Sequence, residues 1–377
     1  MDFKPLSHFI DRITSWRIPW AEVLVIHRNE TVYRYRNGYV NLEEMTPIND
    51  GQIINMYSMT KILTCTAALQ LVEKGAILLN DPLSFYLPEF LEMSVHKTLP
   101  NGEVVQDKAE RQILVRDLFT MTAGFCHDFA APFIQEVKNH TNGKVPTLIF
   151  VKALAKEPLL FEPGTRWNYS FCHDVLAALV EVVDGRRFST YIRDEITGPL
   201  GLKDTGFDLS SEQQRRLAPQ YEYDIELGKP IRKDENIARF GSEYESGGAG
   251  LFSTVNDYAM FLNTLTNLGT SSNHIRILSP ASVELMRMDH LTESTRGDFS
   301  WEHMAGYGFG LGVRTHITAT KSGSLSSIGE FGWSGAAGCL AIIDPISQLT
   351  VMYGQQLLNS QEPILHPRLR NIIYSCL

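Results

Sequence analysis

The sequence is poor in cysteine, and the cysteines that it has form no pattern. They are odd in number, and no two of them make a C-x-x-C pair: Cys65, Cys126, Cys172, Cys339 and Cys376. A disulfide framework needs paired cysteines in an oxidising compartment, so this usage favours reduced thiols. We expect Cys65 and Cys339 to lie in the core, because both fall in apolar segments.

Long apolar runs and a targeting segment are also absent. No apolar run approaches the roughly 18 to 20 residues that a membrane-spanning helix requires. Residues 1–8 lack the basic start, the apolar centre and the small-residue cleavage site of a secretory signal. We therefore expect a cytoplasmic protein with no membrane partner.

Positive charge is scarce relative to negative charge. The chain has 34 Lys and Arg against 43 Asp and Glu, a formal net charge of −9, and no block of basic residues. This balance argues against a surface that binds nucleic acid or an anionic membrane. The 11 histidines form neither H-E-x-x-H nor another close metal-binding spacing, so we expect no metal and no other cofactor.

What the sequence contains is an ordinary globular chain of 377 residues, 44% hydrophobic and 20% charged, long enough for one large or two closely packed domains. Strand patterns occupy both ends, and helical patterns dominate residues 58–288. The predicted strands cover 21–27, 31–36, 307–315, 328–333, 338–343 and 349–355, and further helices are predicted over 5–16 and 363–374.

Strands at both ends predict that the termini pair in one mostly antiparallel sheet flanked by helices, an α/β (α+β) fold. We predict that residues 1–57 and 305–377 form this sheet unit and that residues 58–304 form a mainly helical unit. A cleft between two such units is a natural place for a functional site.

One short motif carries chemistry. Ser58 and Lys61 are spaced so that, on a helix, both side chains lie on one face, one turn apart. A serine hydroxyl is a weak nucleophile until a neighbouring base takes its proton, and a lysine can act as, or support, that base. The sequence has a second Ser-x-x-Lys at Ser94 and Lys97, so the motif alone is a weak signal.

Context separates the two matches. Apolar or small residues follow Ser58 at helical spacing as far as Val72, and Gly75 then gives a helix stop. Ser94 instead lies in a polar stretch that leads into residues 100–102, a Pro-Asn-Gly loop or hairpin signature. We therefore predict Ser58 as the nucleophile.

Three further segments accompany the motif. Residues 162–171 place Tyr169 after a Pro-Gly turn and before an apolar helix, residues 247–254 are rich in glycine, and residues 331–338 join two strands through small residues. Each also has a purely structural interpretation, in which Tyr169 is a buried aromatic residue and residues 333–335 form a bulged strand. No G-x-S-x-G elbow occurs, so an α/β-hydrolase site has no support.

The order of these segments resembles the serine β-lactamase and penicillin-binding-protein superfamily, most closely its class C-like branch of esterases, acyltransferases and D-amino-acid peptidases. The resemblance extends over residues 10–370 and includes 118–124 and 199–205. It implies a β-lactamase/transpeptidase-like fold, with Ser58 as the acylated nucleophile and Lys61 and Tyr169 as its proton-transfer partners. It also implies an oxyanion hole formed by the backbone N–H groups of Ser58 and Ala336.

The resemblance leaves the literal base open between Lys61 and Tyr169, because their titrations are coupled. It also implies that substrate contacts residues of two motifs: Phe171, and the third motif with Trp333, Ser334 and Gly335.

Two of these positions depart from the β-lactam-processing pattern. Phe171 stands where the Tyr-x-Asn element has asparagine, and Trp333 stands where Lys-Thr-Gly has lysine. Both changes replace polar recognition with apolar surface, which favours a carboxylic ester as substrate. Our leading hypothesis is a serine hydrolase that cleaves esters, with acyl transfer and the oligomeric state left open. The alternatives are a β-lactamase, DD-peptidase or D-aminopeptidase that acts on amides, and a catalytically silent binding protein.

Overall fold

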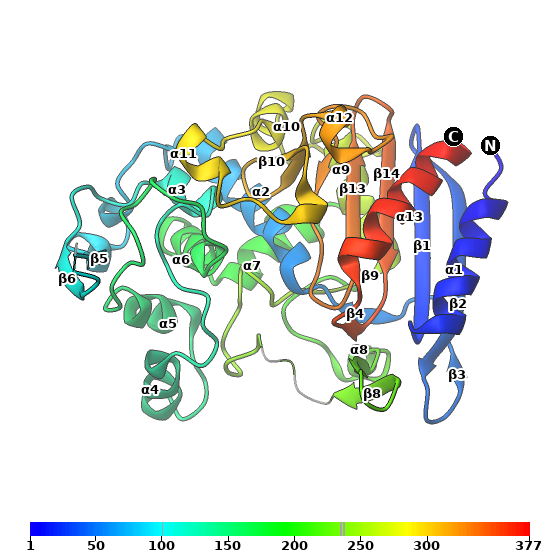
Figure 1. The fold of residues 1–377 in the computed structure, drawn as a ribbon, viewed down its shortest axis with the longest axis horizontal. Helices are drawn as coiled ribbons and strands as arrows, with labels where there is room; N and C mark the ends of the chain where they lie inside the picture. The colour runs from blue at the N-terminus through cyan, green and yellow to red at the C-terminus, as the bar shows by residue number, and fades with distance from the viewer. Residues whose placement is uncertain (100, 234–235, 237) are drawn as a thin grey trace.

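A computed structural model describes residues 1–99, 101–233, 236 and 238–377, and its centre is an eight-stranded antiparallel sheet (Figure 1). The strand order is β10-β11-β12-β13-β14-β1-β2-β3. The strands are β1 (Trp20–His27), β2 (Glu30–Asn41), β3 (Thr46–Pro47), β10 (Tyr307–Phe309), β11 (Arg314–His316), β12 (Phe331–Gly332), β13 (Leu340–Asp344) and β14 (Leu349–Gly354). The fold class predicted from the sequence is confirmed.

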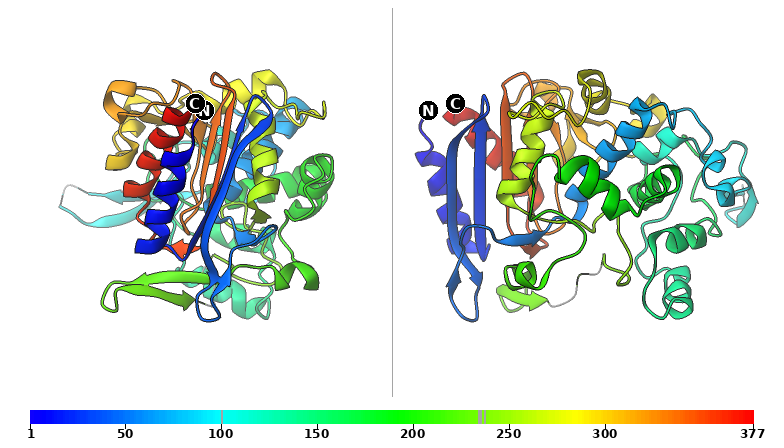
Figure 2. Two further views of the ribbon diagram at one scale, coloured as in Figure 1. Left: turned by 90° about the vertical axis from the view of Figure 1, so that its right-hand side faces the viewer. Right: turned by 180° about the vertical axis from the view of Figure 1, so that it is seen from behind.

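The two ends of the chain meet in the middle of this sheet. β1 pairs antiparallel with β14, with Val25 opposite Val351, and almost every residue of both strands is buried. Successive side chains of a strand point to opposite faces, so a strand buried throughout needs cover on both sides. Helices α1 (Lys4–Trp16) and α13 (Glu362–Cys376) cover one face, and α9 (Val255–Thr266) covers the other (Figures 1 and 2).

Most of the remaining helices come from the segment between β4 (Ile53–Asn55) and β10. The long buried helix α2 (Thr60–Glu73) packs against α6 (Cys172–Asp184), and Cys65 and Cys339 are both fully buried, as expected. The other helices are α3 (Val115–Phe119), α4 (Pro132–His140), α5 (Thr147–Leu154), α7 (Phe188–Ile192), α8 (Ser211–Arg215), α10 (Pro280–Arg287), α11 (Glu293–Arg296) and α12 (Ala319–Ser322). Short 3₁₀ or π turns cover Tyr57–Met59, Leu83–Phe85, Pro88–Phe90, Arg193–Thr197 and Glu302–Met304.

Three small sheets include strands from the region 58–304, which was predicted as mainly helical. They are β4 (Ile53–Asn55) with β9 (Phe252–Thr254), β5 (Ser94–Thr98) with β6 (Val104–Lys108), and β7 (Gln220–Asp224) with β8 (Lys229–Lys233) and β15 (Leu357–Leu358). β15 pairs parallel with β7, a contact between distant segments that no local pattern reveals. The predicted division into two units stays a prediction, and α9, which falls inside 58–304, packs on the sheet.

No helix among the residues that the structure describes is both long and apolar enough to cross a membrane.

A buried ion pair crosslinks the sheet close to the third motif. The Arg314 guanidinium donates to both carboxylate oxygens of Glu330 at 2.9 and 3.1 Å, and their side chains are 2% and 0% exposed. Arg370, from α13, lies 3.7 Å from the same carboxylate. Removing one member of a buried pair leaves an uncompensated charge, which is strongly destabilising.

We therefore predict that Glu330→Gln lowers the free energy of unfolding by about 3–5 kcal/mol in chemical denaturation. Glu222→Gln is the matched control, since its partner Lys233 is 48% exposed and the pair lies in water. A Glu330→Gln protein as stable as the Glu222→Gln control would contradict the account of this pair.

Candidate active site

Ser58 lies in a sharp turn between a strand and a helix. β4 leads into the 3₁₀ turn that contains Ser58, and α2 follows at once. Tyr57 has a φ of +47°, a left-handed conformation that is strained for a bulky residue, and its hydroxyl donates a hydrogen bond to Gln220. This turn places Lys61 one helical turn beyond Ser58, as the motif spacing predicts.

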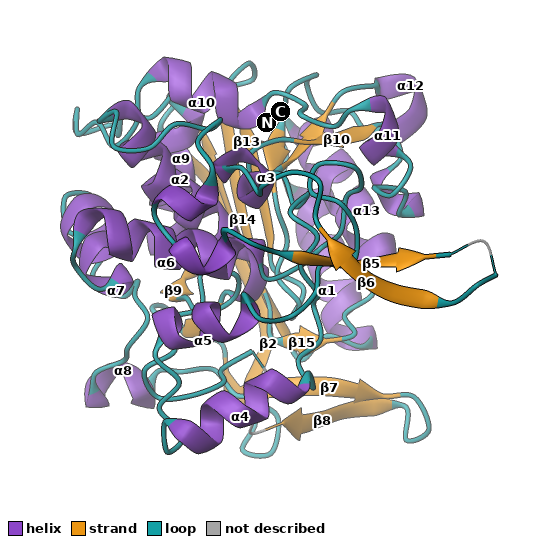
Figure 3. Cartoon of the chain, turned by 90° about the vertical axis from the view of Figure 1, so that its left-hand side faces the viewer, coloured by secondary structure: helices purple, strands orange, loops and turns teal. Residues whose placement is uncertain are grey.

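The second Ser-x-x-Lys lies in a different environment. Ser94 and Lys97 belong to β5, in a hairpin that projects from the body of the molecule (Figure 3). The Lys97 side chain is 56% exposed and lies 3.5 Å from Asp107 on the paired strand. This lysine is therefore engaged at the surface, away from the buried environment that surrounds Lys61.

Three predicted side chains meet at one point. Lys61, which is 2% exposed, directs its Nζ to Ser58 Oγ at 3.2 Å and to the carbonyl oxygen of Gly248 at 2.7 Å. The Tyr169 hydroxyl lies 2.5 Å from Ser58 Oγ, and Lys61 Nζ lies 4.6 Å from the centre of the Tyr169 ring. The serine hydroxyl thus has two candidate proton acceptors within hydrogen-bond distance.

Asp174 is a further residue of this site that the sequence reasoning missed. Its carboxylate is 3% exposed and accepts hydrogen bonds from the Tyr244 hydroxyl (2.7 Å), the Ser246 hydroxyl (2.6 Å) and the Gly248 N–H (3.4 Å). Burial raises the pKa of Asp174, and these hydrogen bonds and the charge of Lys61 oppose the rise. The available signal was an acidic residue directly before the apolar run 175–180 of α6, because a buried carboxylate requires partners.

The glycine-rich segment fits only because it lacks side chains. A β-carbon on Gly248 would come within 2.7 Å of Asp174 Oδ2 and 3.5 Å of Lys61 Nζ, and one on Gly247 would meet the carbonyl oxygen of His173 at 2.3 Å. The absence of these side chains lets the Gly248 N–H donate to Asp174 while the Gly248 carbonyl oxygen accepts from Lys61.

Aromatic packing orients Tyr169. Its ring stacks on Trp333 with centroids 5.9 Å apart and an interplanar angle of 11°, and the His127 ring meets it edge-on at 5.0 Å. Trp333 is only 3% exposed, and Trp301, which is 40% exposed, lies at 6.2 Å from Tyr169. Trp333, which stands where the Lys-Thr-Gly motif has lysine, therefore packs on one face of the Tyr169 ring.

The other predicted substrate contacts differ in their access to the site. Phe171 is 2% exposed and packs against Phe129, Phe150 and other aromatic rings. Ser334 is half-buried and bridges to Leu340 across the strand turn. Direct contact of these residues, and of Gly335 and Trp333, with a substrate stays a prediction.

Two backbone N–H groups are available near Ser58. Among the described residues, neither Ser58 nor the exposed Ala336 uses its N–H in a hydrogen bond to another protein group. Gly335 allows the close approach of the two segments, because a β-carbon there would lie 2.6 Å from the carbonyl oxygen of Met56. Both N–H groups are therefore free to donate to a substrate, and the oxyanion hole itself stays a prediction.

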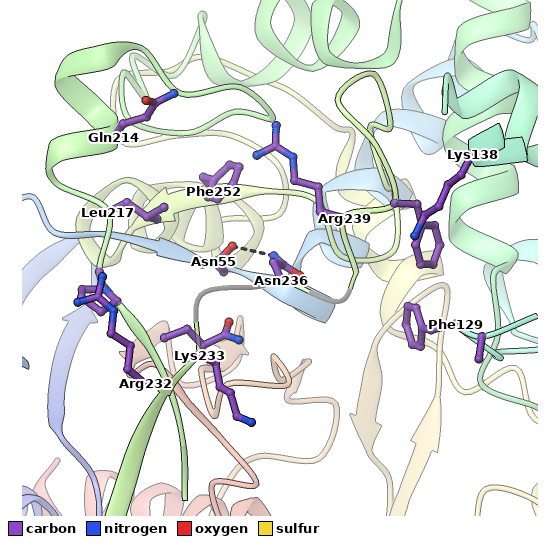
Figure 4. Close-up of a pocket in the computed structure, with 15 residues that line it drawn as sticks. Asn55, Phe129, Lys138, Gln214, Leu217, Arg232, Lys233, Asn236, Arg239 and Phe252 are labelled. Atoms are coloured by element: carbon purple, nitrogen blue, oxygen red, sulfur yellow. Dashed lines mark hydrogen bonds between the residues drawn. The ribbon is translucent and has the colours of Figure 1, made fainter. Parts of the chain in front are cut away.

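A cavity of about 860 Å³ is lined by Asn55 of β4, the strand that leads into the turn at Ser58, but by none of Ser58, Lys61 and Tyr169 (Figure 4). Lys138, Arg239 and other basic residues lie on its wall, together with Phe129 and Phe240. Phe129 also packs against a small buried cluster that contains Tyr57, Ala238 and Ala337.

Known proteins resemble this chain along almost its whole length. The family described as Beta-lactamase matches residues 7–373. Protein Rv1367c of Mycobacterium tuberculosis is 32% identical over 342 residues, which cover 88% of this chain and 84% of that protein. Esterase EstB of Burkholderia gladioli is 26% identical, over 91% of this chain and 87% of the esterase. The solved structure of simvastatin synthase (LovD) from Aspergillus terreus superposes with a TM-score of 0.83 at 23% identity, covering 100% of this chain and 98% of that one.

The two Ser-x-x-Lys motifs give a matched test of the nucleophile. We predict that a fluorophosphonate labels Ser58 and that Ser58→Ala abolishes both labelling and ester turnover. Ser94→Ala should leave both almost unchanged, because its motif lies in the projecting hairpin. Peptide mass spectrometry identifies the labelled residue, and a label elsewhere would refute the assignment.

Proton transfer is tested at the two partners of the serine. Lys61→Ala and Tyr169→Phe should each lower kcat by at least about a hundredfold, the lower end of general acid–base contributions, with a smaller change in KM. Lys97→Ala, at the equivalent position of the second motif, is the control and should leave kcat unchanged. A near-normal kcat in either site variant at its optimum pH would remove that residue from the mechanism.

Proposed function

The protein belongs to the β-lactamase family, and we propose that it is a serine hydrolase that cleaves carboxylic esters through an acyl-enzyme on Ser58. The observation that carries this proposal is the Ser58 hydroxyl, which lies 3.2 Å from Lys61 Nζ and 2.5 Å from the Tyr169 hydroxyl. A hydroxyl between two proton-transfer groups is suited to nucleophilic attack on a carbonyl carbon.

The first half of the reaction forms the acyl-enzyme. Ser58 Oγ attacks the ester carbonyl carbon, and its proton passes to the Lys61–Tyr169 pair. The N–H groups of Ser58 and Ala336 donate to the carbonyl oxygen as it becomes negative. One such donor is typically worth about 2.7–4 kcal/mol of transition-state stabilisation. The bond to the alcohol oxygen then breaks, and the alcohol leaves with the proton returned by the same pair.

The second half releases the acyl group. Water gives a proton to the Lys61–Tyr169 pair and attacks the acyl carbon, which frees a carboxylic acid and returns the proton to Ser58 Oγ. An alcohol in place of water would give a new ester, so the same site supports acyl transfer.

Two observations favour esters over β-lactams. Trp333, in place of the motif lysine, presents an indole that packs on Tyr169 and no cation for a substrate carboxylate. A desolvated carboxylate without an opposite charge is costly, whereas a neutral ester has no such cost. The relative named Esterase EstB, similar over 91% of this chain, supports the same choice.

We predict that kcat/KM for short-chain p-nitrophenyl esters exceeds that for a chromogenic cephalosporin by at least about a hundredfold, roughly 2.7 kcal/mol in transition-state binding. Trp333→Lys should narrow this gap, mainly by weakening ester turnover, because it supplies a cation and removes the stacking on Tyr169. Trp333→Phe keeps an aromatic ring without a charge and should leave the preference in place. A wild-type protein that hydrolyses cephalosporins as well as esters would make β-lactamase activity the better conclusion.

A further inference from the structure

A smaller cavity borders Ala336, one of the two predicted oxyanion-hole residues. It measures about 330 Å³ and is lined by His303, Ala336 and the segment 359–363. Glu362 lies in its wall and also borders a void of about 10 Å³ behind Ser334. The Glu362 side chain is 23% exposed, so its carboxyl group lies between the third motif and a cavity that reaches solvent.

The turn before Glu362 is held in a strained conformation. Gln361 has a φ angle of +64°, which is uncommon for a residue of this kind, whereas Asn359, at +49°, has a conformation that asparagine adopts more readily. Asn359 is fixed to β7 by two hydrogen bonds of 3.0 Å with the backbone of Tyr223. Such strain persists only where the surroundings impose it, and it gathers at functional sites. The turn sets Glu362 at the first position of α13, next to Ala336.

Glu362 has no cationic partner in contact among the described residues. Its carboxylate faces Nδ1 of His366 at 3.8 Å, and His366 directs its Nε2 to the carbonyl oxygen of Gly338 at 3.0 Å. Burial lowers the pKa of His366 to about 3, so this ring is neutral at pH 7. The remaining neighbour is the Ser334 hydroxyl, which offers the carboxylate a hydrogen bond.

The two arginines around this void form their ion pairs with Glu330 and not with Glu362, although Arg370 Nε has no hydrogen-bond partner among the described residues. Arg314 and Arg370 line the void, and both direct their guanidinium groups to Glu330. His303, on the opposite wall, has its pKa lowered by burial and by these two arginines, which favours the neutral ring. A carboxylate with these surroundings gains from a positive charge that enters the cavity, and it repels a negative one.

We propose that Glu362 and Ser334 form a subsite for a cationic group of the substrate, so that the enzyme prefers esters that carry an ammonium group and disfavours those that carry a carboxylate. The inference rests on the proposed ester hydrolysis and adds the substrate class. It assigns a specificity role to a residue of α13 that none of the motifs contains. The carboxylate beside Ser334 acts in the same direction as the replacement of the motif lysine by Trp333.

The subsite has a pH dependence that follows from its burial. Burial raises the pKa of Glu362 to about 7, against the hydrogen bond from Ser334. Above this pH the carboxylate is ionised and attracts a cation. As the pH falls through 7 the group becomes neutral, and the preference for the cation fades.

The test uses two esters of the same acid that differ in one atom. A choline ester carries a quaternary nitrogen where a 3,3-dimethylbutyl ester carries a carbon. We expect wild-type kcat/KM at pH 8.5 to favour the choline ester by about tenfold, which corresponds to about 1.4 kcal/mol. The ratio should fall several-fold by pH 6. Because both esters use the same Ser58, the pH dependence of catalysis cancels in the ratio.

A second pair of substrates places the charge on the acyl group instead of the alcohol group. It consists of p-nitrophenyl esters with and without a trimethylammonium group on the acyl chain.

Charge removal gives the direct control. Glu362→Gln should bring the ratio close to one at both pH values, whereas Glu302→Gln, an exposed carboxylate in the neighbouring turn, should leave it unchanged. If no ester is turned over, the proposed function fails. If esters are turned over but neither pair shows a preference, or the preference survives Glu362→Gln, the subsite is refuted. A wild-type ratio that does not fall between pH 8.5 and pH 6 would also contradict the subsite.

Discussion

The buried amino group of Lys61 is the interaction on which the rest of the site depends. A lysine that is 2% exposed must have hydrogen-bond partners, and it finds them in the Gly248 carbonyl at 2.7 Å and the Ser58 hydroxyl at 3.2 Å. The first partner requires a glycine loop that Asp174 holds from α6. The second requires the strained turn at Tyr57. The hydrogen bonds of the Lys61 amino group thus fix the positions of α2, α6, the Gly248 loop and Ser58 relative to one another.

Packing and chemistry are joined at Tyr169. Its hydroxyl reaches Ser58 while its ring lies on Trp333, which is almost fully buried. The residue that replaces a cationic side chain in the third motif therefore orients a proton-transfer group, and the same replacement removes a site for a substrate carboxylate. Trp333 removes a positive charge from the third motif, and Glu362 adds a negative charge beside Ser334. Substrate preference and catalytic geometry are in this way properties of one strand turn.

The parts of the structure that local patterns encode were predictable. Runs of branched and aromatic residues predicted the β1–β2 hairpin. Strands were also predicted near the C-terminus, although residues 307–315, predicted as one strand, contain β10 and the start of β11, which pair antiparallel. The Ser58-to-Lys61 spacing with its apolar helix identified which of the two motifs is buried. The resemblance to the β-lactamase superfamily is likewise confirmed. Three features were not predicted, because each depends on contacts between segments far apart in the chain. They are the contact of Asp174 with the Gly248 loop, the parallel pairing of β15 with β7, and the position of Glu362 beside Ser334. The burial of Phe171 and Trp333 has the same origin, since only the packed aromatic cluster decides which rings remain exposed.

The central claim is that an ester passes through a covalent acyl group on Ser58. Rapid-quench mass spectrometry with p-nitrophenyl butyrate tests it most directly, because a butyryl group adds a defined mass that peptide mapping can place. The account predicts this mass on the peptide that contains Ser58, formed at least as fast as turnover and lost when the substrate is consumed. A butyryl group that forms at turnover rate on any other residue would contradict it.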